Sequence, residues 1–313
     1  MGALSTRGER RPYLVVTGMH RSGTTLTGRI LACFQEVQVI HEPLNSEYGL
    51  NEVRHVYPCD LDAEQERFYG ALLGRLLDGK ADFVRHVTAD RPLKAVARAA
   101  IGGRTGLDVA RFRLRRLLSP SLQPLLKDPF AALLSRSLIR EGGRVLALMR
   151  HPAAIWLSIK RMEWQFRFAG FAYAGVFKDL GLSVSAEALD TRPEVEKFAW
   201  LWTAIYTYLE GLAGHGQFLL VRHEDLCRQP AIEVQRMASF FGLRPRRRAR
   251  EFIARNMFAE TVAAPGKRLH LFERNAAALP AAWHGRLGAE EEMIIRTVCG
   301  PLVERNYGRW LPL

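Results

Sequence analysis

Short apolar runs alternate along the chain with longer stretches in which apolar positions recur at helical spacing. Most of the runs consist largely of Val, Ile, Leu and Phe, a composition typical of strands that are buried on both faces. They lie at residues 13–17, 37–40, 125–127, 145–149 and 218–221. The alternation predicts an α/β fold with a doubly wound parallel sheet that is flanked by helices.

Helical patterns follow four of these runs directly. We expect these helices at residues 24–34, 130–140, 153–168 and 231–241, and further helices at 194–212 and 290–304. Pro129, Pro152 and Pro230 stand where a first helical turn would begin, a position at which the missing N–H of proline is not needed. Residues 50–120, with a helix at 64–77, are predicted to be a helical insertion, because no flexible linker flanks them.

The size and composition of the chain favour one domain. Its 313 residues, 48% hydrophobic and 25% charged, are enough to bury a large core and exclude intrinsic disorder. We expect a single domain over 1–313, with a core at about 12–243, the insertion at about 50–120 and a C-terminal loop and helix at 244–313. Four scattered cysteines without metal-ligand spacing favour a reducing compartment and no metal site.

No segment has the pattern of a membrane anchor or an export signal. The longest uncharged apolar stretch, residues 198–209, is well short of the roughly 20 residues that cross a bilayer. The N-terminal residues contain charges and lack both a long apolar segment and a small-residue cleavage site. We therefore expect no membrane span and a cytoplasmic protein.

The charge balance indicates acidic partners. The chain has 45 Lys and Arg against 32 Asp and Glu, a net charge of +13, and most of these cations are arginines. Guanidinium groups suit bidentate recognition of phosphate, sulfate and carboxylate, so nucleic acid, polyanionic substrates and phosphorylated cofactors all remain open. High-GC codon usage is an alternative explanation of so many arginines.

A glycine-rich turn between the first strand and the first helix is the strongest motif. Gly18 and Gly23 are spaced as in G-x-x-x-x-G-K-[ST], a loop whose backbone N–H groups and helix N-terminus hold a phosphate. Thr24 occupies the position of the usual lysine, and the cation is Arg21, within the loop. The motif predicts a P-loop-type sheet with a phosphate-binding loop of unusual composition.

A second anion site is predicted after the fourth strand. Arg150 ends that strand, and Ser158 follows about two turns into the next helix. A guanidinium and a hydroxyl in this arrangement can clamp a phosphate, although a strand-end arginine paired with a carboxylate is the alternative. Both motifs would lie at the carboxyl edge of a parallel sheet, so a nucleotide with 5′ and 3′ phosphates fits them together.

These motifs resemble those of the sulfotransferases that use 3′-phosphoadenosine 5′-phosphosulfate (PAPS). R-S-G-T-T at 21–25 is similar to their 5′-phosphosulfate loop, in the arginine version of carbohydrate, tyrosylprotein and many bacterial members. R-H-P-x5-S at 150–158 is similar to their 3′-phosphate motif. Residues 219–243 resemble the family's Y-E-D-L…P…F-L-G-L segment, with His223 in place of the tyrosine, whereas 50–120 has no counterpart.

The resemblance implies a sulfotransferase that moves a sulfuryl group in line from PAPS to a hydroxyl of a carbohydrate or glycolipid, with 3′,5′-adenosine bisphosphate (PAP) as product and without a metal. Trp200 and Trp202 are expected in the core, with stacking on adenine as the alternative. Lys267 and Arg268 are implied to close over the 3′-phosphate, or else form a solvated charge pair. The cofactor-binding residues that the resemblance implies are Arg21, Ser22, Gly23, Thr24, Thr25, Arg150, Ser158, Lys267 and Arg268.

The resemblance also implies catalytic residues. Glu42, just after the second strand, is implied as the base that takes the acceptor's proton, and His41 is the second candidate. Lys127, at the end of the third strand, resembles a family lysine that contacts the phosphosulfate, and Arg21 would stabilise charge on the bridging oxygen. The alternatives are an ion pair between Glu42 and an arginine, and a solvated Lys127.

Two other functions remain open. A P-loop NTP-dependent kinase would need Asp128 or Asp225 as a metal ligand. An arginine-rich RNA- or polyanion-binding protein would use a run such as 244–250, but no aromatic-interleaved RNA motif accompanies it, so we expect no nucleic-acid partner. The same arginines would also suit an acidic saccharide as acceptor. The sequence does not determine the acceptor or the oligomeric state.

Overall fold

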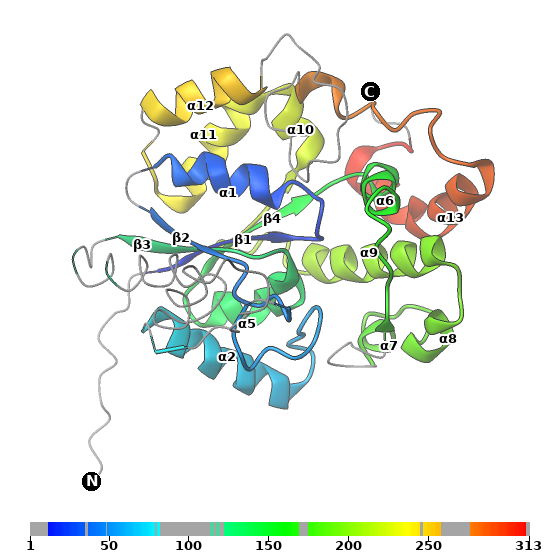
Figure 1. The fold of residues 1–313 in the computed structure, drawn as a ribbon, viewed down its shortest axis with the longest axis horizontal. Helices are drawn as coiled ribbons and strands as arrows, with labels where there is room; N and C mark the ends of the chain where they lie inside the picture. The colour runs from blue at the N-terminus through cyan, green and yellow to red at the C-terminus, as the bar shows by residue number, and fades with distance from the viewer. Residues whose placement is uncertain are drawn as a thin grey trace, which may run out of the picture.

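A parallel sheet of five strands forms the centre of the molecule, in the order β2-β3-β1-β4-β5 (Figure 1). The computed structural model describes residues 12–34, 37–47, 49–78, 80–81, 114, 118, 122–168, 175–244, 247–257 and 276–310. Its strands are β1 (Leu14–Gly18), β2 (Val37–His41), β3 (Gln123–Lys127), β4 (Arg144–Met149) and β5 (Phe218–Arg222). All five predicted strands and the predicted fold class are therefore confirmed.

The register aligns the carboxyl ends of the strands at one edge of the sheet. Gly18 is level with Leu148, and His41 is level with Lys127. β1 lies between β3 and β4, so the chain that follows it stands where the strand order changes direction. In open parallel sheets, ligands bind beyond the carboxyl ends of the strands at such a point. The loop after β1 occupies that place here.

Helices cover both faces of the sheet, which explains why the strands are apolar throughout. Leu14 and Val16 belong to one buried cluster, and the intervening Val15 belongs to the other. Figure 1 shows α1, α10, α11 and α12 on one side of the sheet and α2, α5 and α9 on the other. The helices are α1 (Thr24–Ala32), α2 (Ala63–Leu77), α5 (Ser135–Arg140), α6 (Pro152–Lys160), α7 (Val176–Asp179), α8 (Ala186–Asp190), α9 (Glu194–Glu210), α10 (His223–Arg228), α11 (Pro230–Phe241), α12 (Arg247–Met257) and α13 (Ala289–Tyr307), with 3-10 turns η1 (Pro129–Leu134) and η3 (Ala276–Ala278).

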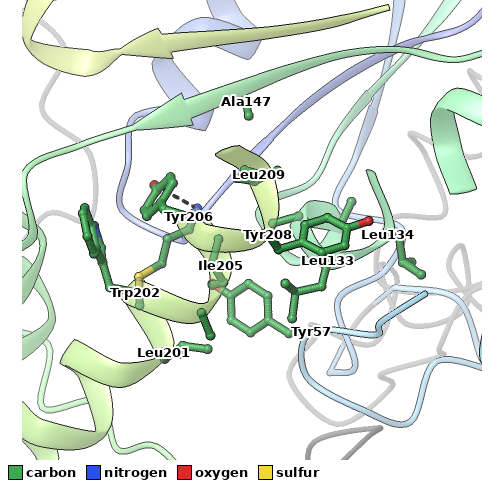
Figure 2. Close-up of a cluster of buried hydrophobic side chains, with 14 of the residues drawn as sticks. Tyr57, Leu133, Leu134, Ala147, Leu201, Trp202, Ile205, Tyr206, Tyr208 and Leu209 are labelled. Atoms are coloured by element: carbon green, nitrogen blue, oxygen red, sulfur yellow. Dashed lines mark hydrogen bonds between the residues drawn. The ribbon is translucent and has the colours of Figure 1, made fainter. Parts of the chain in front are cut away.

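Helix α9 supplies buried phenols that tie the core to the sheet edge. Figure 2 shows Trp202, Tyr206 and Tyr208 on this helix within the core. The Tyr206 hydroxyl donates to the carbonyl of Leu148 (2.8 Å) and accepts from the N–H of Met19 (3.3 Å). Buried hydroxyls need such partners, so these bonds hold the loop after β1 against β4. Trp202 is fully buried, as expected for a core residue.

Two helices differ from their predicted forms. The stretch expected as a helix at 130–140 begins as η1 and becomes α-helical only in α5. The helix expected at 153–168 ends at Lys160, because the chain takes a left-handed turn at Glu163 (φ 54°). That turn brings Trp164 beside the loop after β1, with its ring centroid 5.3 Å from that of His20. Pro129, Pro152 and Pro230 do lie in the first turns of their helices.

The predicted insertion is described only in part. Helix α2 confirms the helix expected within it, and most of 82–121 lies outside the described residues. The domain boundaries therefore stay a prediction. Among the described helices, none is both long enough and apolar enough to cross a bilayer.

Packing between α1 and β3 yields a first test, at Gly28. A Cβ atom there would lie 2.8 Å from Cγ of the buried Lys127, so alanine has to displace that side chain. We expect Gly28→Ala to lower the free energy of unfolding by about 1–3 kcal/mol in urea titrations. Gly70→Ala in α2 is the matched control, since the nearest atom to a Cβ at that position would be 3.9 Å away. This variant should raise the free energy of unfolding by up to about 1 kcal/mol. Equal changes in the two variants would show that Gly28 is not packed tightly against Lys127.

Candidate active site

The loop between β1 and α1 has glycines at two places that admit no side chain. Gly18 (φ 131°) and Gly23 (φ 107°) both have left-handed backbones. A Cβ atom on Gly18 would lie 2.3 Å from the carbonyl oxygen of Leu148, and one on Gly23 would lie 2.5 Å from Cδ2 of His223. The loop therefore packs closely between β4 and the side chain of His223. The sequence did not indicate this contact of His223.

Helix α1 presents an uncapped, positively polarised N-terminus. Its N-cap is Gly23, which makes no side-chain cap, and its first turn contains no acidic residue. Helix α2 contrasts with it, because Asp62 caps that helix by accepting the N–H groups of Glu64 and Gln65. The first-turn N–H groups and the dipole of α1 therefore suit a bound anion. Ser22, Thr24 and Thr25 lie at this end, as predicted.

The structure brings the two predicted anion motifs together. The Nε of Arg21 donates to Oγ of Ser158 (2.9 Å), and the guanidinium of Arg150 donates to the carbonyl of Arg21 (3.0 Å). Trp202 supports the second motif, since its indole N–H donates to the carbonyl of Arg150 (3.1 Å). Two guanidinium groups and the end of α1 thus converge, an arrangement that suits an anion with charge at two places.

The segment after β4 is anchored by a buried carboxylate. Glu224 accepts the N–H of His151 (2.9 Å) and the hydroxyl of Tyr307 (2.9 Å). Burial raises the pKa of Glu224, and the nearby positive charge of Arg150 opposes that shift. A strand-end arginine paired with a carboxylate was the alternative for Arg150, and Glu224 is a carboxylate close to it. The hydrogen bonds described above join Glu224 to the backbone of the next residue, His151, and to Tyr307.

His151 connects the same segment to the C-terminal part of the chain. Its Nε2–H donates to the carbonyl of Trp310 (2.8 Å), and its ring stacks on Trp283 with centroids 4.5 Å apart. Burial lowers the pKa of His151 to about 3. The imidazole is therefore neutral at ordinary pH, and it acts as a structural link rather than as an anion-binding cation.

Glu42 and Lys127 form a buried ion pair at the edge of the sheet. Lys127 is 2% exposed, and its ammonium bonds Oε1 of Glu42, while Asn45 Nδ2 donates to Oε2 (3.1 Å). The expected alternative of a solvated Lys127 is wrong, because the alignment of β2 and β3 places this lysine inside, over Gly28. Glu42 does form an ion pair, with this lysine.

The second candidate base is placed differently. The side chain of His41 is 48% exposed, and its Nε2 is 3.9 Å from Oε1 of Glu42. Glu42 is buried, and its backbone has a left-handed φ of 46°. A carboxylate fixed by two hydrogen bonds is better positioned for proton transfer than a side chain that is half in solvent.

Asp128 and Asp225, the acids that a kinase reading would need, have structural partners. Asp128 accepts the N–H groups of Leu44 (2.5 Å) and Phe130 (2.9 Å). Burial, together with the charge of Glu42, raises the pKa of Asp128 to about 7. Asp225 pairs with Arg222, with Oδ2 2.6 Å from Nε. In the part of the chain that the structure describes, no group of three or more His, Cys, Asp or Glu is arranged for a metal ion.

Sequence reasoning missed a contact between His20 and Tyr57. The N–H of His20 donates to the Tyr57 hydroxyl (3.0 Å), and Nδ1 of the same residue lies 2.6 Å from that oxygen. Burial, with the charge of Arg21, lowers the pKa of His20 to about 3. The position of His20 within the glycine loop was a usable signal, whereas Tyr57 lies outside every motif.

Two predicted cofactor-binding residues, Lys267 and Arg268, lie outside the described residues, so their contact with a 3′-phosphate stays a prediction.

The start of α12, with Arg247 and Arg248, is described. The charge of Arg248 acts on Cys33, just beyond the end of α1, which places it at the opposite end of that helix from the glycine loop.

Comparison with known proteins gives one consistent match. A family model for the sulfotransferase domain matches residues 11–265. Carbohydrate sulfotransferase 7 from Mus musculus is 29% identical over 126 residues, which are 37% of this chain and 26% of that protein. The protein of the same name from Rattus norvegicus is 30% identical over 103 residues, 33% of this chain and 21% of that protein.

The matched segments span about a quarter of the length of these curated relatives. Among solved structures, the sulfotransferase domain from the curacin biosynthetic pathway covers 94% of this chain and 98% of its own, at 14% identity and a TM-score of 0.48.

The burial of His151 predicts an acid-sensitive fold. Between about pH 6.5 and about pH 3 the unfolded chain binds a proton at His151 that the native chain does not, so stability falls as pH falls. We expect His151→Gln to flatten the slope of unfolding free energy against pH by about 1.4 kcal/mol per unit near about pH 5. Urea titrations from about pH 4 to about pH 7 measure it. Equal slopes in wild type and His151→Gln would refute the linkage.

Proposed function

The chain belongs to the sulfotransferase domain family, and on this premise we propose that it transfers a sulfuryl group from PAPS to a hydroxyl group of a carbohydrate or glycolipid. One observation supports this function above the others. Arg21 bonds Ser158, and Arg150 bonds the backbone of Arg21, so motifs more than a hundred residues apart form one anion-binding cluster. A donor with phosphate groups at its 5′ and 3′ positions matches that cluster.

The residues around the loop suit the two anionic ends of PAPS. The uncapped end of α1 and the bare glycine backbone would hold the 5′-phosphosulfate, together with Arg21 and Ser22 to Thr25. Arg150 and Ser158 would hold the 3′-phosphate. Lys267 and Arg268 are proposed, from the sequence alone, to close over that phosphate.

Bound PAPS supplies the activated sulfuryl group, and the side chains of this protein manage charge and protons around it. Glu42 would accept the proton that leaves the acceptor oxygen as that oxygen bonds sulfur. Arg21 would offset the negative charge that grows on the departing phosphate oxygen, and Lys127 would add a second cation. We propose no role for a metal ion in this step.

We favour Glu42 over His41 as the base for a geometric reason. Lys127 and Asn45 hold the two carboxylate oxygens of Glu42 at the end of β2. The left-handed backbone of Glu42 is a strained conformation, and strain of this kind is found at positions where function requires a set orientation. His41 extends half into solvent and lies within reach of the same carboxylate, where it is suited to pass the proton onward.

The acceptor class that we propose is taken from the curated relatives. The curated relatives in the comparison are carbohydrate sulfotransferases, although each alignment covers a limited part of both chains. A saccharide or glycolipid hydroxyl is therefore the acceptor that we propose. An acidic saccharide also suits the net charge of +13.

Thermal stabilisation by PAP tests the donor site. A ligand at 100 times its Kd adds about 2.7 kcal/mol to the stability of the native state, so a bound PAP should raise Tm clearly. We expect this rise in the wild type and its loss in Arg150→Ala, with little response to 5′-AMP or Mg-ATP. Arg192→Ala is the control, because Arg192 is exposed and belongs to none of the proposed anion-binding motifs, and this variant should respond as the wild type does. Stabilisation by Mg-ATP instead of PAP would refute the proposal.

Substitution of Glu42 tests the base. We expect Glu42→Gln to lower kcat by about 10²–10⁴-fold, because the amide cannot accept the proton. PAP stabilisation should persist, since the amide oxygen can still accept from Lys127. Sulfuryl transfer measured with radiolabelled PAPS gives kcat, and His41→Gln is the comparison. A larger loss in His41→Gln than in Glu42→Gln would assign the base to His41.

A further inference from the structure

An aromatic cluster surrounds His20, beside the glycine loop. It consists of Tyr57, Phe130, Trp164 and Phe166, whose ring centroids lie 5.3–6.3 Å from that of His20. Tyr57 is buried in the same hydrophobic cluster as Leu133 and Ile205 (Figure 2). Phe166 is buried as well, but Trp164 is 39% exposed. The cluster thus contains buried rings, and the indole of Trp164 is exposed to solvent.

This cluster adjoins the groups that we assign to the reaction. The guanidinium carbon of Arg21 lies 5.9 Å from the ring centroid of Trp164. The charges of Arg21 and Glu42 both act on His20, so the imidazole lies near the cation of the glycine loop and near the proposed base. A molecule resting on Trp164 would therefore be next to the proposed site of sulfuryl transfer.

Backbone strain is concentrated in the same segments. Among the described residues, the non-glycine positions with left-handed φ are Arg21, Glu42, Tyr57 and Glu163. Such a conformation costs about 1–3 kcal/mol and persists where the surrounding structure demands it. Arg21 and Glu42 carry the proposed chemistry, Tyr57 orients His20, and Glu163 turns the chain so that Trp164 faces the loop. The four positions therefore share one small region of the molecule.

Tyr57 holds His20 by two contacts. The Tyr57 oxygen accepts the backbone N–H of His20 (3.0 Å) and lies 2.6 Å from Nδ1 of the same residue. We assign the hydroxyl proton to the bond with Nδ1, so that the imidazole carries its own proton on Nε2. Because burial keeps the ring neutral, His20 offers one N–H donor without adding a charge to the site.

We propose that Trp164 and His20 form the acceptor subsite and that its occupant is a pyranose ring. The indole stacks against the C–H face of the sugar, and the Nε2–H of His20 donates to a sugar oxygen. The inference rests on the proposed sulfotransferase function and adds the residues that select the acceptor.

The chemistry of the surroundings favours a sugar over a wholly apolar acceptor. A pyranose has an apolar face and a rim of hydroxyls. The indole meets the face, while the Nε2–H of His20 offers a polar partner for the rim. A flat aryl or steroid acceptor would cover that N–H without bonding it, and a buried polar group without a partner costs about 1–3 kcal/mol.

Steady-state kinetics with substituted enzyme tests the subsite. The acceptors are neutral, N-acetylated and uronic-acid-containing tetrasaccharides, with 2-naphthol as the aryl alternative. We expect Trp164→Ala to raise the KM of the saccharides by about tenfold and Trp164→Phe by less, since the smaller ring still stacks. His20→Phe keeps the ring packing but removes the donor, and should lower kcat/KM for saccharides by about tenfold. The PAP-induced rise in Tm should remain in all three variants.

Phe68→Ala is the matched control, because Phe68 is an equally exposed aromatic residue (44%) on α2, where its ring packs on Tyr69. It should leave KM unchanged. Should Trp164→Ala not fold, Trp164→Leu keeps apolar bulk but removes the flat face, and the same rise in KM is expected.

The outcomes separate this inference from the function beneath it. If PAP fails to stabilise the wild type, the proposed function is wrong and the subsite falls with it. If PAP binds and the saccharide KM is unchanged in Trp164→Ala, the function stands and the subsite is overturned. Turnover of 2-naphthol alone, or loss of PAP binding in the Trp164 variants, would also overturn it.

Discussion

The placement of charge inside the edge of an apolar sheet is the constraint on which the rest of the site depends. Lys127 is surrounded by protein, and an unpaired ammonium there would carry a desolvation penalty of several kcal/mol. Glu42 compensates it, which requires β2 and β3 to stay in register and α1 to have no side chain at Gly28. Asp128 adds to this arrangement, because it accepts the N–H of Leu44 and so holds the chain just after Glu42. The proposed base is therefore fixed by packing around a buried cation.

Buried side chains support the backbone of the loop after β1 and of the segment after β4. Tyr206 of α9 joins the N–H of Met19 to the carbonyl of Leu148, and Trp202 of the same helix holds the carbonyl of Arg150. Glu224 holds the backbone of His151. Both arginines thus stand on backbone that buried side chains have fixed, so the cations are preorganised for an anion. The stability of the core and the proposed affinity for the donor therefore depend on the same bonds.

In our proposal, the aromatic cluster around His20 adds selectivity for the acceptor. The arginines and the N-terminus of α1 are proposed to recognise the donor by charge. The proposed acceptor subsite combines the exposed indole of Trp164 with the neutral imidazole of His20, whose ring centroids lie 5.3 Å apart. Tyr57 and Glu163 have left-handed φ values, which are strained for residues other than glycine, and this strain accompanies the placement of His20 and Trp164.

Local features of the sequence were sufficient for much of this protein. The five strands, the starts of helices at prolines, the spacing of Gly18 and Gly23, and the motif that runs from Arg150 to Ser158 all follow from short-range patterns. Tertiary structure alone decided that Lys127 is buried against Glu42, that Tyr57 contacts the ring of His20, and that α6 ends early so that Trp164 meets the loop. The physical reason is that periodicity and turn chemistry act over a few residues. Contacts such as that between Glu42 and Lys127, 85 residues apart, depend on register and packing, which no local pattern encodes.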